Sequence, residues 1–192
     1  DSIKSEPAFV PEPNGHPYAV DLVKQMAAMN KGHYLHEEIE NITPTRFCIG
    51  VAGYPEKHFE APNMKSDLKY LKAKVDAGAD YIVTQMFFDN KAYFDFVDKC
   101  REIGITVPLI PGLKILTSKK QASLLSKTFK IDIPETLLDA VEKCKDDKAA
   151  KEVGIEWAIQ QSKELVKGKA PVLHFYTMGT SDATKQVAGA IF

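Results

Sequence analysis

The 192-residue sequence has no long apolar run and no excess of either charge. No stretch approaches the roughly 18–20 apolar residues that span a bilayer, so no membrane-spanning helix is expected. Lys and Arg number 25 and Asp and Glu 26, for a net charge of −1. A nucleic-acid-binding surface needs clustered positive charge, so we expect neither a membrane nor a nucleic acid as partner.

Cysteine is scarce. Cys48, Cys100 and Cys144 are odd in number, widely spaced and each set in an apolar segment. This pattern predicts buried free thiols rather than a disulfide or a metal site. The acidic, proline-rich start (DSIKSEPAFVPEPN) lacks the basic head and apolar stretch of a secretory signal. We therefore expect a cytoplasmic protein.

Several enzyme signatures are also missing. The sequence contains no Walker loop, GxGxxG, HExxH, CxxC or GxSxG motif. Hydrophobic residues make up 44% and charged residues 27%, as in an ordinary globular domain. The chemistry must therefore be sought in single polar residues and their place in the fold.

Short apolar runs alternate with amphipathic stretches along the chain. The runs predict strands near 47–52, 81–86, 107–111 and 172–177, the first of them buried on both faces. Helices are predicted over 64–77 and 148–166, in the stretch from Tyr93 to Cys100, and from Ser118, Pro134 and Ser181. We expect one domain: an extended arm (1–16), a helix and connection (17–46) and four βα units (47–192).

This alternation predicts parallel strands joined by right-handed crossovers. A closed (β/α)₈ barrel needs eight units, and only four are present. Both a small doubly wound sheet and half of a barrel agree with the pattern.

Polar side chains follow the strands at their carboxyl ends, where parallel α/β folds bind ligands. Tyr54 and Tyr176 offer stacking faces, and the Gln85 amide can pair with a heterocycle. His58, Asp67 and Lys74, on the loop after the first strand and the helix that follows, are suited to bind a pyrophosphate and a ribose.

Each of these residues also has a purely structural interpretation. His58 could be a solvated loop residue, Asp67 and Lys74 an exposed helix face, and Tyr176 part of the core. Gln85 is the hardest to explain in this way, because an amide inside an apolar strand costs free energy unless it is hydrogen-bonded.

The segment GVAGYPEKHFEAPNMKSDLKYLKAKVDAGADYIVTQMFFD (50–89) closely resembles methylenetetrahydrofolate reductases, which share YPE-x-H, D-x₆-K-x-DAGA and TQ-x-FFD. Further matches are GHPYAVDLV (15–23), IPG (110–112) and HFYTM (174–178). The resemblance implies a partial (β/α)₈ TIM barrel, about its last four βα units, with parallel strands inside and helices outside.

The resemblance also implies a reaction and its ligands. Such enzymes bind FAD without a covalent bond and reduce 5,10-methylenetetrahydrofolate to 5-methyltetrahydrofolate, with NADH or NADPH as donor, in one-carbon metabolism and methionine biosynthesis. Family FAD contacts fall on Tyr18, Ala19, Ala52, Tyr54, His58, Ala61, Asp67 and Lys74. Family substrate positions fall on Gln85, which also meets the nicotinamide, and on Gln121, Leu125 and Tyr176.

Two departures from the family pattern affect these expectations. The family's catalytic glutamate and an Arg-Gly-Asp motif beside the flavin have no counterpart in this chain, so it offers no catalytic residue. We expect the chain by itself to be inactive. The family also has Asn-Arg where this chain has Gly179-Thr180, which puts folate contacts at that corner in doubt.

Two alternatives stay open. A non-catalytic half-barrel could pair with itself or with a separate N-terminal chain, and its open sheet edges favour a homo-oligomer. An unrelated lyase or aldolase would need a lysine at a strand end, and Lys114 is the only approximate candidate.

Overall fold

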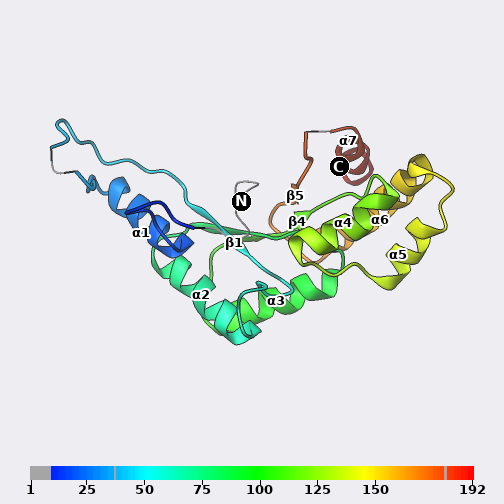
Figure 1. Ribbon diagram of the computed structural model, residues 1–192, viewed down its shortest axis with the longest axis horizontal. Helices are drawn as coiled ribbons and strands as arrows, with labels where there is room; N and C mark the ends of the chain where they lie inside the picture. Colours follow the sequence, from blue (N-terminus) through cyan, green and yellow to red (C-terminus); the bar gives the residue numbers. More distant parts are fainter. Residues whose placement is uncertain (1–9, 37, 180) are drawn as a thin grey trace.

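The computed structural model describes residues 10–36, 38–179 and 181–192. Its helices are α1 Ala19–Asn30, α2 Met64–Asp76, α3 Asn90–Glu102, α4 Lys119–Phe129, α5 Glu135–Glu142, α6 Asp147–Lys167 and α7 Asp182–Ile191. Its strands are β1 Gly50–Gly53, β2 Tyr81–Thr84, β3 Leu109–Ile110, β4 Gly112–Leu113 and β5 His174–Phe175. The strands run through the middle of the molecule, with α2 and α3 below them and α1 to their left in Figure 1.

All the paired strands are parallel. β1 pairs with β2, and β2 pairs with β3; Gly50 lies opposite Tyr81 and Ile82 opposite Leu109. β4 and β5 form a second parallel pair. The predicted parallel strands with intervening helices are therefore confirmed, and neighbours in space follow the order of the chain.

The predicted third strand, 107–111, is observed only as β3 at 109–110, and Pro111 separates it from β4, which begins just beyond the predicted span. A proline has no N–H to donate to a sheet. The Pro111 carbonyl instead accepts from His174 N at 3.0 Å, which directs the chain from the first sheet to the second. Thr84 joins the two sheets, because its hydroxyl accepts from Gly112 N at 2.9 Å.

The first strand starts three residues later than predicted. The backbone of Phe47 is hydrogen-bonded to the Asn30 side chain, and Ile49 N donates to Asp80 Oδ2 at 2.7 Å. The expectation that this strand is buried on both faces is wrong: Gly50 and Ala52 are exposed, while the two residues alternating with them are buried. The last strand is also shorter than its predicted span of 172–177.

The helix starts depend on local capping. Asn63 Oδ1 accepts from Ser66 N at 2.9 Å at the start of α2, and Asp146 Oδ1 accepts from Ala149 N at 2.8 Å at the start of α6. Gly78 follows α2 with φ +121°, a conformation that favours glycine. Pro134 lies at the N-cap of α5 rather than in its first turn.

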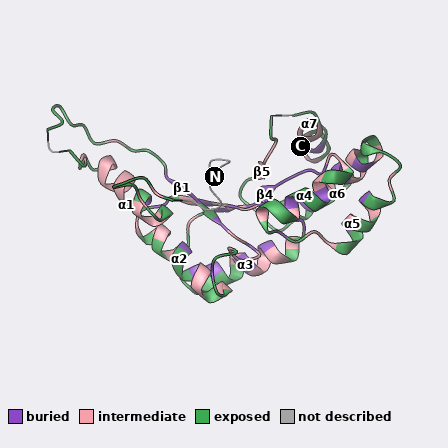
Figure 2. Cartoon of the chain, viewed as in Figure 1, coloured by how far each residue is buried: buried purple, intermediate pink, exposed green. Residues whose placement is uncertain are grey.

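The core lies where these helices meet the strands (Figure 2). Leu68 and Leu71 of α2 pack with Ile82 of β2 and Phe96 of α3 in one cluster. A second cluster joins α4, α5 and α6 around Leu137. The first cluster packs amphipathic helices against β2, and the second packs the apolar faces of three helices against one another and against the segment after β2.

The cysteines are free, as predicted, but they differ in burial. Cys100 is buried and Cys144 partly buried, whereas Cys48 is exposed. The predicted burial of Cys48 is wrong because residues 47 and 48 precede the sheet instead of entering it. In the part of the chain that the structure describes, no helix is both long and apolar enough to cross a membrane.

Candidate functional site

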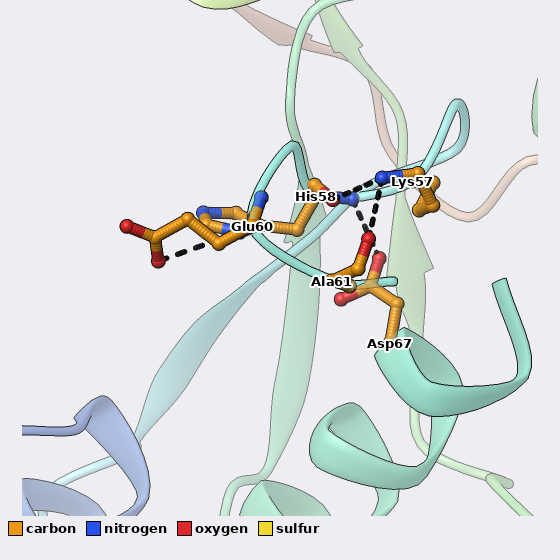
Figure 3. A network of polar contacts seen from close by, with 5 residues as sticks. All are labelled: Lys57, His58, Glu60, Ala61 and Asp67. Carbon is orange, nitrogen blue, oxygen red and sulfur yellow. Dashed lines mark hydrogen bonds and ion pairs between the residues drawn. The ribbon is translucent and has the colours of Figure 1, made fainter. Parts of the chain in front are cut away.

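The loop between β1 and α2 gathers several of the expected cofactor residues (Figure 3). His58 N donates to Asp67 Oδ2 at 2.8 Å, which fixes the loop to the first turn of α2. Lys57 Nζ donates to the carbonyl oxygens of His58 at 2.8 Å and Ala61 at 2.7 Å. Lys57, which the sequence analysis did not single out, holds the loop closed from a left-handed conformation with φ 82°.

Charges and aromatic rings meet on the same loop. The ring of His58 lies edge-on to that of Tyr54, with centroids 4.5 Å apart. Burial raises the pKa of the Tyr54 hydroxyl, and the Asp67 carboxylate raises it further. Lys74 Nζ donates to Ala52 O at 2.7 Å, and burial lowers the pKa of this lysine while Asp67 opposes the shift. The loop and α2 therefore bring a carboxylate, an ammonium group and two rings together.

Gln85 lies beside this loop, at the end of β2. Its backbone N donates to Gly53 O at 2.8 Å, so it continues the strand pairing by one residue. Its Oε1 accepts from Met86 N at 3.1 Å, and no other described residue is hydrogen-bonded to its side-chain amide. Gln85 and Tyr54 line a small hollow of about 20 Å³, closed on its far side by Phe129, Lys130 and Ile131 at the end of α4.

The side chains of the other expected substrate residues are engaged in contacts within the fold. The Tyr176 hydroxyl donates to Thr84 O at 2.9 Å, and burial raises its pKa, with a further contribution from Tyr54. Gln121 Oε1 accepts from Thr117 N at 2.8 Å and so stabilises the start of α4. Leu125 is 5% exposed and packs in the cluster with Met86 and Phe88.

Some expected residues lie apart from the loop. Tyr18 and Ala19 are exposed at the start of α1, and no hydrogen bond or ring contact among the described residues joins them to the loop. Gly179 has φ +87°, and Thr180 lies outside the described residues. Lys114 as a residue is only 7% exposed; its Nζ donates to Tyr176 O at 3.0 Å, and burial lowers its pKa.

Glu56 is a residue that the sequence analysis missed. It lies between Tyr54 and His58, lines the hollow with Gln85 and accepts from Asp132 N at 2.9 Å through Oε2. Burial raises its pKa from 4.5 to about 7; the bond from Asp132 lowers it, and the carboxylates of Asp132 and Asp89 raise it again. Its position in the YPE-x-H motif was the available signal, but the partner 76 residues away appears only in the fold.

Parallel strands with polar side chains gathered at their carboxyl ends place the chain among α/β domains, a class whose ligand sites lie at that end. The sequence profile described as methylenetetrahydrofolate reductase matches residues 1–191. The chain belongs to this family. The unrelated lyase or aldolase considered for Lys114 is thereby excluded.

Individual relatives agree. The chain is 39% identical over 165 residues to a probable methylenetetrahydrofolate reductase (NADPH) of Caenorhabditis elegans, covering 85% of this chain and 24% of the relative. It is 38% identical over 180 residues to methylenetetrahydrofolate reductase (NADH) 1 of Arabidopsis thaliana, a match that covers 88% of this chain and 28% of the relative. It is 37% identical over 142 residues to 5,10-methylenetetrahydrofolate reductase of Buchnera aphidicola, a match that covers 73% of this chain and 49% of the relative.

The chain thus spans from about a quarter to half the length of these relatives. Among solved structures, it is similar to a Clostridium thermocellum protein described as binding two copies of 5-methyl-5,6,7,8-tetrahydrofolic acid. The TM-score is 0.52 at 15% identity, and the match covers 91% of this chain and 68% of that one. At this identity the similarity concerns the fold alone.

Proposed function

We propose that this chain forms the C-terminal half of a (β/α)₈ barrel in a protein that reduces 5,10-methylenetetrahydrofolate to 5-methyltetrahydrofolate. The proposed donor is NADH or NADPH, and the proposed cofactor is FAD. One observation carries the proposal: the β1–α2 loop and Gln85, where the family resemblance is densest, lie together at the carboxyl ends of neighbouring parallel strands. That is where barrels bind ligands.

The residues of the loop suit a dinucleotide cofactor. One carboxylate oxygen of Asp67 accepts from His58 N, and the other can accept a hydrogen bond from a ribose hydroxyl. The Lys74 ammonium has three N–H groups, and the structure gives one to Ala52 O, which leaves donors for a pyrophosphate. When bound, a flavin supplies the hydride transfer between the nicotinamide donor and the folate.

The hollow at Gln85 is too small for a whole folate ring, but the Gln85 amide at its wall suits hydrogen bonding to the edge of one. The Gln85 Nε2 group has no hydrogen-bond partner in the described residues, and its Oε1 is bonded only to the neighbouring Met86 N. A pterin presents paired donors and acceptors that such an amide can complement. Tyr54 provides an aromatic edge on one side, and the end of α4 closes the other.

We further propose that the 192-residue chain is inactive by itself. The family's catalytic glutamate has no counterpart here, and preorganised acids and electrostatic groups contribute several kcal/mol to catalysis. The experiment compares menadione reduction by NADH and by NADPH, with FAD added, for this chain and for a full-length parent. Turnover by the chain near that of the parent would contradict the proposal and would direct attention to Glu56 as an acid within the chain.

The second candidate function is a non-catalytic half-barrel that pairs with itself or with a separate chain. The edges of the sheet favour this candidate. Within the described residues, β1 and β5 are each paired on one side only, and Gly50 and Ala52 leave one face of β1 exposed. Unpaired strand edges and exposed apolar surface promote association. Sedimentation velocity over a range of concentrations tests self-pairing: a homo-oligomer supports it, and a monomer throughout contradicts it.

A further inference from the structure

A hollow in the described residues lies away from the expected cofactor and folate residues. Its volume is about 710 Å³, within the usual range of small-molecule sites. It lies between the β2–α3 connection, the segment before α5 and one face of α6, where Trp157, Gln160, Gln161 and Glu164 follow helical spacing. None of the twelve residues expected to bind FAD or folate lines it.

The apolar part of this hollow is aromatic and fixed in place. Trp157 Nε1 donates to Phe88 O at 3.1 Å, which sets the indole against the β2–α3 connection. Gln161 Nε2 donates to Phe87 O at 3.1 Å one turn further along α6. Phe88, Phe94 and Pro134 complete the wall. An indole face held in this way attracts a cation through its ring quadrupole.

The polar part of the hollow carries negative charge. Asp89, Asp132 and Glu164 line it against one ammonium, that of Lys91, which is already paired with Asp95. Among the described residues, none of the three lining carboxylates is in an ion pair. Glu164 is hydrogen-bonded only through neutral amides, from Asn90 Nδ2 at 2.8 Å and Gln160 Nε2 at 2.7 Å.

One acceptor at this wall is also unsatisfied. Asn90 Oδ1 is buried and has no hydrogen-bond partner within the described part of the chain. A buried acceptor without a donor costs free energy, but this oxygen is out of contact with solvent, so the acceptors open to a ligand are the carboxylate oxygens of Asp89, Asp132 and Glu164. The wall therefore offers acceptors, negative charge and an aromatic face, and its one ammonium is already occupied.

We propose that this hollow is a second ligand site, which binds a small planar organic cation such as an amidinium or guanidinium. The flat cation packs against Trp157, and its N–H groups donate to the Glu164 carboxylate, a geometry that a planar fork of donors matches. A neutral amide of the same shape lacks the charge, and a carboxylate of the same shape is repelled by the three acidic side chains.

Fluorescence tests the site directly, because Trp157 is the only tryptophan in the sequence. Benzamidine, benzamide and benzoate are titrated separately into the 192-residue chain. We expect a saturable change with benzamidine, binding at least threefold weaker with benzamide and none with benzoate. Equal binding of benzamidine and benzamide, or a response to benzamidine that never saturates, would overturn the proposal.

Two variants locate the cation. Glu164→Gln keeps the side-chain shape and one acceptor and should weaken benzamidine binding about three- to fivefold, since Glu164 is exposed and its charge is screened. Asp132→Asn is the second variant, should the first lose its fold. Glu156→Gln, an exposed position on α6 outside the hollow, and Gln85→Glu serve as controls that should leave binding unchanged. Unchanged affinity in both lining variants would contradict the site.

Discussion

The Tyr176 hydroxyl donates a 2.9 Å hydrogen bond to the Thr84 carbonyl oxygen and so links the end of β5 to the end of β2. The ring passes over β4 at Gly112, where a Cβ would meet the ring at 2.7 Å and would also meet Thr84 O. This link holds together the strand ends on which the proposed folate site depends.

Removing the hydroxyl should weaken this link. We expect Tyr176→Phe to lower the free energy of unfolding by about 1 kcal/mol, because Thr84 O is left without this donor. Urea denaturation measures the change. Tyr70→Phe, at a residue 58% exposed on α2, is the matched control and should have no effect. Equal stabilities for Tyr176→Phe and the unmodified chain would show that the link contributes nothing.

A methyl group at Gly112 should be more harmful. Gly112→Ala places a Cβ against Tyr176 and Thr84 O, and overpacking of this kind should cost about 2–3 kcal/mol of unfolding free energy. The control is Gly189→Ala in α7, where a Cβ meets nothing within 4 Å. That change should stabilise the helix by up to about 1 kcal/mol. A neutral Gly112→Ala would contradict the close packing of β2, β4 and β5.

The raised pKa of Glu56 predicts a pH dependence of stability. Its pKa is about 7 in the folded chain, against an ordinary value of 4.5, so folding favours the protonated form. The contribution of Glu56 to stability should therefore fall as pH rises from about 4.5 to about 7. Glu56→Gln removes this dependence, and its stability relative to the unmodified chain should rise by about 1–2 kcal/mol over that window, allowing for partial solvent screening.

Thermal and urea unfolding at a series of pH values measures this difference. Glu152→Gln, at an exposed position on α6, is the control and should show a flat difference. If Glu56→Gln and Glu152→Gln behave alike across the pH series, Glu56 titrates as an ordinary surface carboxyl.

The cysteines should react at very different rates. Cys48 is exposed and should react rapidly with Ellman's reagent. Cys100 is 0% exposed, and burial raises its pKa to about 12, so it should react only after unfolding. Cys48→Ser should remove the fast phase. A fast phase that persists in this variant would show that a second thiol is accessible.

Much of the fold could be predicted from local sequence. Asn63 and Gly78 mark the two ends of α2, and the run beginning at Tyr81 gives β2. The start of β1 could not be predicted in this way. The side chains of Asn30 and Asp80, each distant in sequence, accept hydrogen bonds from the backbone N–H groups of residues 47 and 49. The division of the third strand at Pro111 likewise depends on its new partner, His174.

The candidate site shows the same limit. The resemblance around YPE-x-H assigns both Tyr54 and His58 to a cofactor site, and the fold brings their rings into contact. It gives no indication that Lys57 closes the loop through two carbonyl oxygens, or that Glu56 is tied to Asp132. Both depend on backbone conformation and on contacts distant in sequence, which motifs do not encode.

The most direct test of the proposed function is a folate titration of flavin absorbance in a full-length parent protein carrying Gln85→Glu. The substitution keeps the size of the side chain and removes both N–H donors. Loss of a paired hydrogen bond in a partly dry site should weaken methyltetrahydrofolate binding by roughly tenfold or more. The account predicts this loss with FAD still bound. Unchanged folate affinity would contradict it and would leave Gln85 as a structural residue at the end of β2.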